Sequence, residues 1–169
     1  MNLAQADAAP INLRAPVAED GAAVYELIAQ CPPLDTNSMY CNLLQCTHFS
    51  ATSVAAELND DIVGFISGYI QPDKPDTLFI WQVAVGEKAR GQGLAGRMLR
   101  DILARAACDQ VKFIETTITP DNRASWALFE SLANKLGAEL NHSVMFDRQQ
   151  HFAGQHETEM LVRIGPVEQ

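Results

Sequence analysis

The sequence predicts an α/β domain with a mixed β-sheet flanked by helices. Runs rich in β-branched and aromatic residues alternate with amphipathic segments of helical period, and Gly, Pro and Asn-Asp clusters separate the two kinds of segment. Near the middle of the chain a strand, a loop, a helix and a second strand follow one another. The 169 residues are enough for one domain with a substantial core.

The composition limits the class of protein. Hydrophobic residues make up 47% of the chain and charged residues 20%, as in ordinary globular domains. The formal net charge of −9 argues against nonspecific binding to nucleic acid, which needs Lys and Arg. The N-terminus lacks the pattern of a secretory signal, and no apolar run approaches the ~18 residues that span a bilayer. We therefore expect a cytoplasmic protein with thiol cysteines, a floppy tail at residues 1–9 and a single domain over residues 10–169.

The chain is expected to begin with one short strand and two helices. Residues 11–14 suit the strand, and the helix that follows is stopped by the Pro32-Pro33 pair. Asn37 or Ser38 caps the second helix.

Strands and helices alternate after that point. Residues 53–70 form two strands joined by the Asn-Asp-Asp turn at 59–61, a hairpin signal. The remaining elements are predicted as a strand at 77–85, a helix at 93–106, a strand at 111–119, a helix at 123–136 that ends at Gly137, and strands at 143–146 and 158–164.

A glycine-rich turn joins the strand at 78–85 to its helix. The turn reads Arg90-Gly91-Gln92-Gly93-Leu94-Ala95. Glycines let the backbone approach a ligand closely, and a helix start offers free N–H groups and a positive dipole end, which suit a pyrophosphate. A tight turn that only packs the helix on the sheet is the alternative. The turn has neither the GK[ST] of a Walker loop nor the spacing of the dinucleotide fingerprint.

Two motifs resemble the GCN5-related N-acetyltransferases. The turn has the R-x-x-G-x-A form of that family's coenzyme A loop. Further on, Asn122, the run 124–129 and Gly137 resemble the family's N-x-x-A-x-x-L-[YF]-x-x-x-G pattern, with three extra residues before the glycine. The resemblance covers residues 77–138 and implies the GNAT fold, a mostly antiparallel mixed sheet flanked by helices, with a V-shaped splay for acetyl-CoA.

The resemblance also implies roles for single residues. Val83 and Val85 would lie along the pantetheine arm, with the Val83 N–H near the thioester oxygen, and Asn122 would touch the pantetheine or the thiol end. The pyrophosphate would be wrapped by Arg90, Gly91, Gln92, Gly93, Leu94 and Ala95. Many family members protonate the leaving thiolate with a tyrosine, but this position holds Phe129. Another acid or water must then supply that proton.

The rest of the chain is similar to the branch that acetylates L-2,4-diaminobutyrate in ectoine biosynthesis. The similar stretches are CPPLDTNSMY (31–40), TSVAAE (52–57), GFISGY (64–69), PDTLFIWQVAV (75–85), ARGQGLA (89–95) and TTITPDN (116–122). This similarity implies transfer of acetyl to the γ-amine, giving the N4-acetyl product. It also implies a cytoplasmic homodimer that acts in osmoprotection.

Three residues that precede or lie on the strand at 77–85 suit a substrate with two ammonium groups. Asp35 can pair with an ammonium, or else cap the following helix. Tyr40 can hydrogen-bond the substrate or act as the acid, or else pack on its helix. Trp81 offers a cation–π surface, although a tryptophan in a buried strand is often only core.

Three further residues are candidates for substrate binding or for the general base. His156 and Glu159 lie at the end of the polar loop before the last strand. Glu159 can take or orient the amine proton, although most loop acids are merely solvated. Glu115, on the strand at 111–119, is another base, reached through water.

The cysteines and the remaining functional alternatives complete the prediction. Three of the four cysteines lie between Cys31 and Cys46, but their spacing gives no zinc pattern, so no metal is expected and they are interpreted as small buried thiols. The alternatives are an acetyltransferase for a polyamine, amino acid, aminoglycoside or protein N-terminus, and a non-catalytic acyl-CoA-binding module.

Overall fold

The computed structural model describes residues 9–168, so the predicted tail, but for residue 9, lies outside the described residues. The elements follow the predicted order. They are β1 (Asn12–Arg14), α1 (Gly21–Ala29), α2 (Met39–His48), β2 (Val54–Leu58), β3 (Asp61–Gln71), β4 (Lys74–Val85), α3 (Leu94–Leu103), β5 (Phe113–Ile118), α4 (Arg123–Leu136), β6 (Leu140–Phe146) and β7 (Glu159–Ile164). Among residues 9–168, no helix combines the length and the apolar character that crossing a bilayer demands.

Local chemistry sets the element ends. Ser38 caps α2 by accepting a hydrogen bond from the Cys41 N–H at 3.1 Å, as one of the two predicted caps. Asn59 and Asp60 turn the β2–β3 hairpin with φ of 50° and 66°, which these residues tolerate better than most. Gly137 ends α4 in the left-handed conformation, as predicted.

Three element bounds differ from the prediction by three residues. The strand β6 begins at Leu140 rather than at residue 143. The strand β4 begins at Lys74 rather than at residue 77, because Lys74 already pairs with Gln71 and residues 72–73 supply the whole turn. The helix α3 ends at Leu103 rather than at residue 106, and a short 3₁₀ turn follows at residues 106–108.

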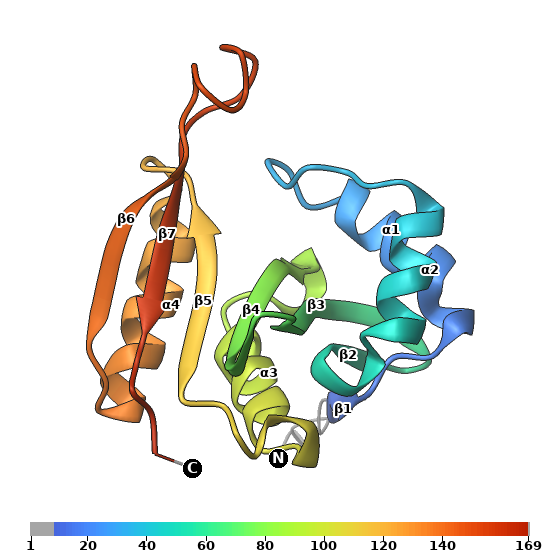
Figure 1. The fold of residues 1–169 in the computed structure, drawn as a ribbon. Coiled ribbons are helices and arrows are strands. Elements are labelled where there is room, and N and C mark those ends of the chain that lie inside the picture. Colours follow the sequence, from blue (N-terminus) through green and yellow to red (C-terminus); the bar gives the residue numbers. More distant parts are fainter. Residues whose placement is uncertain (1–8, 169) are drawn as a thin grey trace, which may run out of the picture.

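The strands form one seven-stranded sheet in the order β1-β2-β3-β4-β5-β7-β6. Among the strands of residues 9–168, only β4 and β5 pair in parallel, which confirms the predicted mixed, mostly antiparallel sheet. The helices α3 and α4 pack over the larger core on one face, whereas α1 and α2 cover a smaller core on the other face, near β3 (Figure 1). Both faces of the central strands are therefore buried, except where the helices leave an opening.

A β-bulge at Trp81 creates that opening. In the pairing of β3 with β4, Ser67 is opposite Gln82 and Gly68 is opposite Ile80, so Trp81 is the extra residue. The bulge reverses the alternation: Ile80 belongs to the larger core, whereas Ala84 belongs to the smaller one. The parallel pairing of β4 with β5 runs from Thr77 to Ile80 and stops there. Beyond that point the two strands diverge (Figure 1).

Candidate active site

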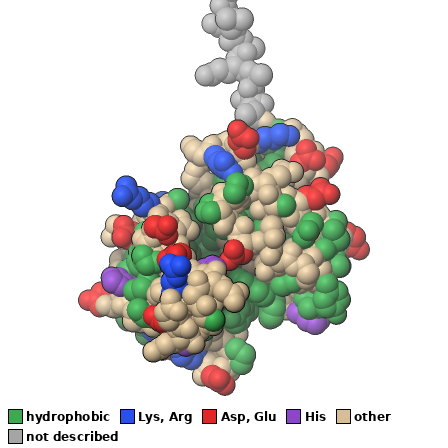
Figure 2. Space-filling model, turned by 90° about the horizontal axis from the view of Figure 1, so that it is seen from above, with side chains coloured by type: hydrophobic (Ala, Val, Ile, Leu, Met, Phe, Trp, Pro, Cys, Tyr) green, Lys and Arg blue, Asp and Glu red, His purple; other side chains and the backbone are tan. Residues whose placement is uncertain are grey.

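A cavity of about 820 Å³ occupies the gap between β4 and β5. Its walls come from the loop between α1 and α2 (residues 30–38, the α1–α2 loop), from β4 and β5, from the start of α4, and from the loop between β6 and β7 (residues 147–158, the β6–β7 loop). The face seen in Figure 2 is hollowed near its middle, and acidic and basic side chains border the hollow. The predicted V-shaped splay is therefore a real cleft.

One wall is the part of β4 that has lost its parallel partner. From Gln82 to Val85, β4 pairs with β3 on one side, and from Trp81 onward the side toward β5 has no strand partner within the described residues. We call this side of residues 81–85 the coenzyme edge. Val83 lines the cavity, while Val85 lies farther along, packed against the larger core. An edge of this kind offers backbone N–H and C=O groups to an extended ligand.

The glycine-rich turn lies just past the coenzyme edge, outside the cavity lining. Gly91 and Gly93 have φ of 76° and 69°, a region in which a side chain is strained. Gly93 is the N-cap of α3, so the N–H groups of Leu94 and Ala95 lie in the first turn of the helix. The Arg90 guanidinium donates to the Val85 carbonyl at 3.1 Å and fixes the turn to the end of β4. The conformation suits an anion at this helix start.

Asn122 has a structural task as well as a place in the cavity. Its side-chain oxygen caps α4 by accepting from the Ser125 N–H at 3.2 Å, and the residue lines the cavity. The cap occupies the oxygen, so the amide NH₂ remains for the cavity. Phe129, in the predicted tyrosine position, also borders the cavity and is almost fully buried.

The β6–β7 loop carries polar side chains to the opposite wall. The loop folds on itself, since Asp147 Oδ1 accepts from the N–H groups of Gln149 and Gln150, each at 2.9 Å. The Phe152 ring lies against the His156 ring, with centroids 4.6 Å apart. The His156 Nδ1–H donates to the Glu157 carbonyl at 2.7 Å, which leaves Nε2 as the nitrogen that faces the cavity.

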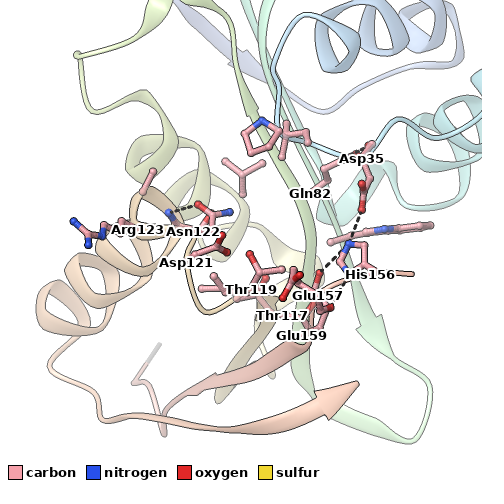
Figure 3. A pocket seen from close by; sticks show the side chains of 18 of the residues that line it. Asp35, Gln82, Thr117, Thr119, Asp121, Asn122, Arg123, His156, Glu157 and Glu159 are labelled. Atoms are coloured by element: carbon pink, nitrogen blue, oxygen red, sulfur yellow. Dashed lines mark hydrogen bonds and ion pairs between the residues drawn. The ribbon is translucent and has the colours of Figure 1, made fainter. Parts of the chain in front are cut away.

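His156 links two carboxylates at the cavity mouth. Its Nε2 lies 3.3 Å from the Asp35 carboxylate and 4.0 Å from that of Glu159 (Figure 3). The hydrogen bond to the Glu157 carbonyl, followed by the charges of the two acids, raises the pKa of His156. Burial raises the pKa of Glu159 despite a hydrogen bond from Thr117 and the nearby imidazole. The structure thus brings together three residues predicted for the substrate: Asp35 from the α1–α2 loop, His156 from the β6–β7 loop and Glu159 from the start of β7.

Trp81 and Tyr40 have different positions. Trp81 borders the cavity, is 43% exposed, and meets the Tyr69 ring edge-on at 6.3 Å, so one side of its indole is free for a cation. Tyr40 is 70% exposed on the first turn of α2 and is not among the residues that line the cavity. The structure therefore does not bring Tyr40 to the other predicted substrate residues.

Glu115 lies outside the cavity, in a cluster of cations. Its side chain is only 3% exposed, pairs with Lys74 at 3.4 Å and contacts Arg163 and Gln71. Burial raises its pKa, but the hydrogen bonds from Gln71 and Arg163 and the charges of Lys74 and Arg163 outweigh burial, so the net pKa is lowered. A carboxylate that is stabilised in its ionised form and held by three partners is a poor proton acceptor.

The four cysteines are free thiols, and three of them are buried. Cys31 and Cys46 are buried in the smaller core, and Cys31 Sγ donates to the Val85 carbonyl at 3.5 Å. Cys108 is buried in the larger core, and Cys41 is half-buried. Burial raises the pKa of Cys46 to about 11, which makes it a weak nucleophile.

The sequence prediction missed several residues that line the cavity, among them Gln82 and Thr117. Gln82 joins the α1–α2 loop to β4, and Thr117 hydrogen-bonds Glu159. Gln82 did carry a signal, because it is a polar residue in the apolar run 78–85. Thr117 carried none, since threonine is ordinary in a strand.

The chain is similar to known proteins along most of its length. Residues 21–133 match the Acetyltransferase (GNAT) family. A protein of Methylotuvimicrobium alcaliphilum named L-2,4-diaminobutyric acid acetyltransferase is 65% identical over 156 residues, which cover 92% of this chain and 91% of that protein. A protein of the same name from Vibrio parahaemolyticus is 56% identical over 89% of this chain and 83% of its own length.

Solved structures are similar as well. Diaminobutyrate acetyltransferase EctA from Paenibacillus lautus, in complex with its substrate L-2,4-diaminobutyric acid and coenzyme A, is 41% identical, with a TM-score of 0.91 over 95% of this chain and 98% of that one. The ribosomal-protein-S18-alanine N-acetyltransferase of Escherichia coli, 14% identical with a TM-score of 0.69 over 95% of this chain and 96% of that one, shares the fold.

Proposed function

The chain belongs to the acetyltransferase (GNAT) family. From its similarity to diaminobutyrate acetyltransferases we propose that it transfers the acetyl group of acetyl-CoA to the γ-amine of L-2,4-diaminobutyrate. The product is N4-acetyl-L-2,4-diaminobutyrate, in ectoine biosynthesis. One observation carries the proposal. A single cavity has the coenzyme edge of β4 on one wall and the carboxylates of Asp35 and Glu159 on another. A cationic amine and a thioester can therefore meet there.

The shape of the mouth favours a small amine. The α1–α2 loop and the β6–β7 loop touch through Asp35 and His156. This contact closes over the cavity and leaves less room for a peptide than an open groove does. The two acids suit the ammonium groups of diaminobutyrate, Trp81 offers a cation–π surface beside them, and Arg148 provides a cation within the lining for the substrate's carboxylate.

The chemistry assigned to the cavity is direct transfer. The γ-ammonium gives a proton to the Glu159 carboxylate, because a buried carboxylate with a raised pKa is the better acceptor. The amine then attacks the thioester carbon, and the Val83 N–H stabilises the oxyanion. The C–N bond forms, the C–S bond breaks, and the coenzyme leaves as a thiolate. The second proton that the attacking nitrogen must lose passes through water to that thiolate, since Phe129 has none to give.

Other roles extend the same proposal. The pantetheine arm would lie along Val83 and Val85 toward Asn122, and the pyrophosphate would lie at residues 90–95. His156 would bind substrate through Nε2, and Tyr40 would reach the substrate only if α2 moved. We treat residues 10–169 as one domain that acts as a cytoplasmic homodimer, which sedimentation of the purified protein would test.

An amine panel tests the proposed function. The protein is incubated with acetyl-CoA and diaminobutyrate, spermidine, ornithine or a peptide N-terminus, and thiol release is followed. Diaminobutyrate is expected to give the fastest release, and NMR should place the acetyl group on N4. Release with spermidine but not with diaminobutyrate would contradict the substrate. No release with any amine would favour an acyl-CoA-binding module.

A further inference from the structure

One side chain of β4, that of Gln82, forms hydrogen bonds with the α1–α2 loop. Gln82 is 9% exposed, and both ends of its amide are used. Its Nε2 donates to the Asp35 carbonyl at 2.7 Å, and its Oε1 accepts from the Asn37 Nδ2 at 3.2 Å. The backbone carbonyl of Asp35 and the side chain of Asn37 are therefore both bonded to β4.

The bulge explains why this contact is possible. Trp81 is the extra residue, so Gln82 lies on the face that carries α1 and α2, opposite Ser67, whereas Val83 packs against the larger core. Consecutive Cα atoms are about 3.8 Å apart. Gln82, which holds the α1–α2 loop, is thus directly followed by Val83, the residue of the coenzyme edge proposed to face the thioester.

Asp35 has a second contact, but the substrate competes for that one. The Asp35 carboxylate pairs with His156, and an incoming ammonium would take the same oxygens. The bond from Gln82 goes to the Asp35 carbonyl, which leaves the carboxylate free. Of the two hydrogen-bonding contacts of Asp35 described within residues 9–168, the one with Gln82 is therefore the one that persists while the substrate is bound.

We propose that Gln82 is a positioning residue that sets the distance between the Asp35 carboxylate and the coenzyme edge, and thereby selects the length of the diamine. The inference rests on the proposed function. Diaminobutyrate must place one ammonium at Asp35 and the other amine at the thioester. A diamine that is one methylene shorter or longer cannot satisfy both if the distance is fixed, and a rigid pocket distinguishes one methylene by roughly 10- to 200-fold.

The test compares three substrates with three proteins. Values of kcat/KM are measured for 2,3-diaminopropionate, diaminobutyrate and ornithine with the wild type, with Gln82→Leu and with Asn37→Ala. Gln82→Leu should lower the preference for diaminobutyrate over both homologues by about tenfold, and raise the KM for diaminobutyrate while that for acetyl-CoA stays within twofold. Asn37→Ala removes one of the two bonds and should give a smaller loss of preference.

The preference is a ratio within one preparation, so partial unfolding of a variant cancels from it. If Gln82→Leu does not fold, Gln82→Glu keeps the shape and the acceptor for Asn37 but removes the donor to Asp35. Normal preferences in every Gln82 variant, whatever the loss of thermal stability, would overturn the positioning role. Absence of wild-type activity with diaminobutyrate would instead contradict the proposed function.

Discussion

The coenzyme side and the substrate side of the cavity are built in opposite ways. The coenzyme side is one continuous segment, residues 83–95, in which a strand edge, a glycine turn and a helix start follow one another. The substrate side joins Asp35, His156 and Glu159, which come from near the two ends of the chain. The first depends on backbone conformation, and the second depends on side chains that only the complete fold brings together.

This difference separates binding from chemistry. Backbone N–H groups and a helix dipole bind any acyl-CoA, whatever the acceptor amine. The side chains of the two loops and of Glu159 supply the charges that distinguish one amine from another, and Glu159 takes the proton. Substitutions on the substrate side should therefore change turnover and specificity, whereas those on the coenzyme side should change coenzyme affinity.

The largest effect is expected from Glu159→Gln. Loss of the proton acceptor should lower kcat by about 10²- to 10⁴-fold, with unchanged affinity for acetyl-CoA, in steady-state assays and coenzyme titrations. Because burial raises the pKa of Glu159 and the ionised form is the base, wild-type kcat should fall as the pH drops through a pKa above the ordinary ~4.3 of a glutamate. The pH profile of kcat for the Glu159→Gln variant should lack this fall at low pH.

Glu157→Gln is the matched control for that substitution. Glu157 lies two residues before Glu159 and also borders the cavity, but its side chain is 59% exposed and pairs with Arg148 at 2.9 Å. The kcat of the variant should stay within a fewfold of the wild type, and any effect should appear in the KM for diaminobutyrate, because Arg148 is proposed to bind the substrate's carboxylate. Equal losses of kcat in the two variants would mean that residues 157–159 as a whole, rather than Glu159, are responsible.

A smaller effect is expected on the coenzyme side from Gly93→Val. A Cβ at Gly93 meets no atom within 4 Å, so the cost comes from φ of 69°, where an L-residue loses about 1–2 kcal/mol. The turn should shift, and acetyl-CoA affinity measured by calorimetry should fall about tenfold. Gly93→Asn, which tolerates this conformation, should lose much less. Equal affinities of the two variants would contradict the role of backbone conformation.

The same contrast explains what the sequence could predict. The order of strands and helices, the Gly137 helix end and the glycine turn depend on local chemistry, and the structure agrees with them. The β-bulge at Trp81 depends on the register between β3 and β4, and no local sequence pattern specifies that register. Gln82 as a loop anchor follows from that bulge. The α2 start at Ser38 leaves Tyr40 exposed, although its neighbours in sequence reach the cavity.

Glu115→Gln gives the smallest change in turnover and the sharpest contrast with Glu159. Both acids lie on strands beside the cleft, but Glu115 is neutralised by Lys74 and Arg163, so kcat should stay within a fewfold of the wild type. The variant should lose about 1–3 kcal/mol of stability in urea unfolding at pH 7, because a buried charge partner is removed.

That loss should depend on pH with a definite sign. The folded-state pKa of Glu115 is lowered, so its contribution is complete above the unfolded value of about 4.3 and disappears as the pH falls through the folded value. Wild type and variant should therefore approach equal stability in acid. A large fall in kcat at unchanged stability would instead make Glu115 a base, and the proton path would then run through the sheet rather than through the β6–β7 loop.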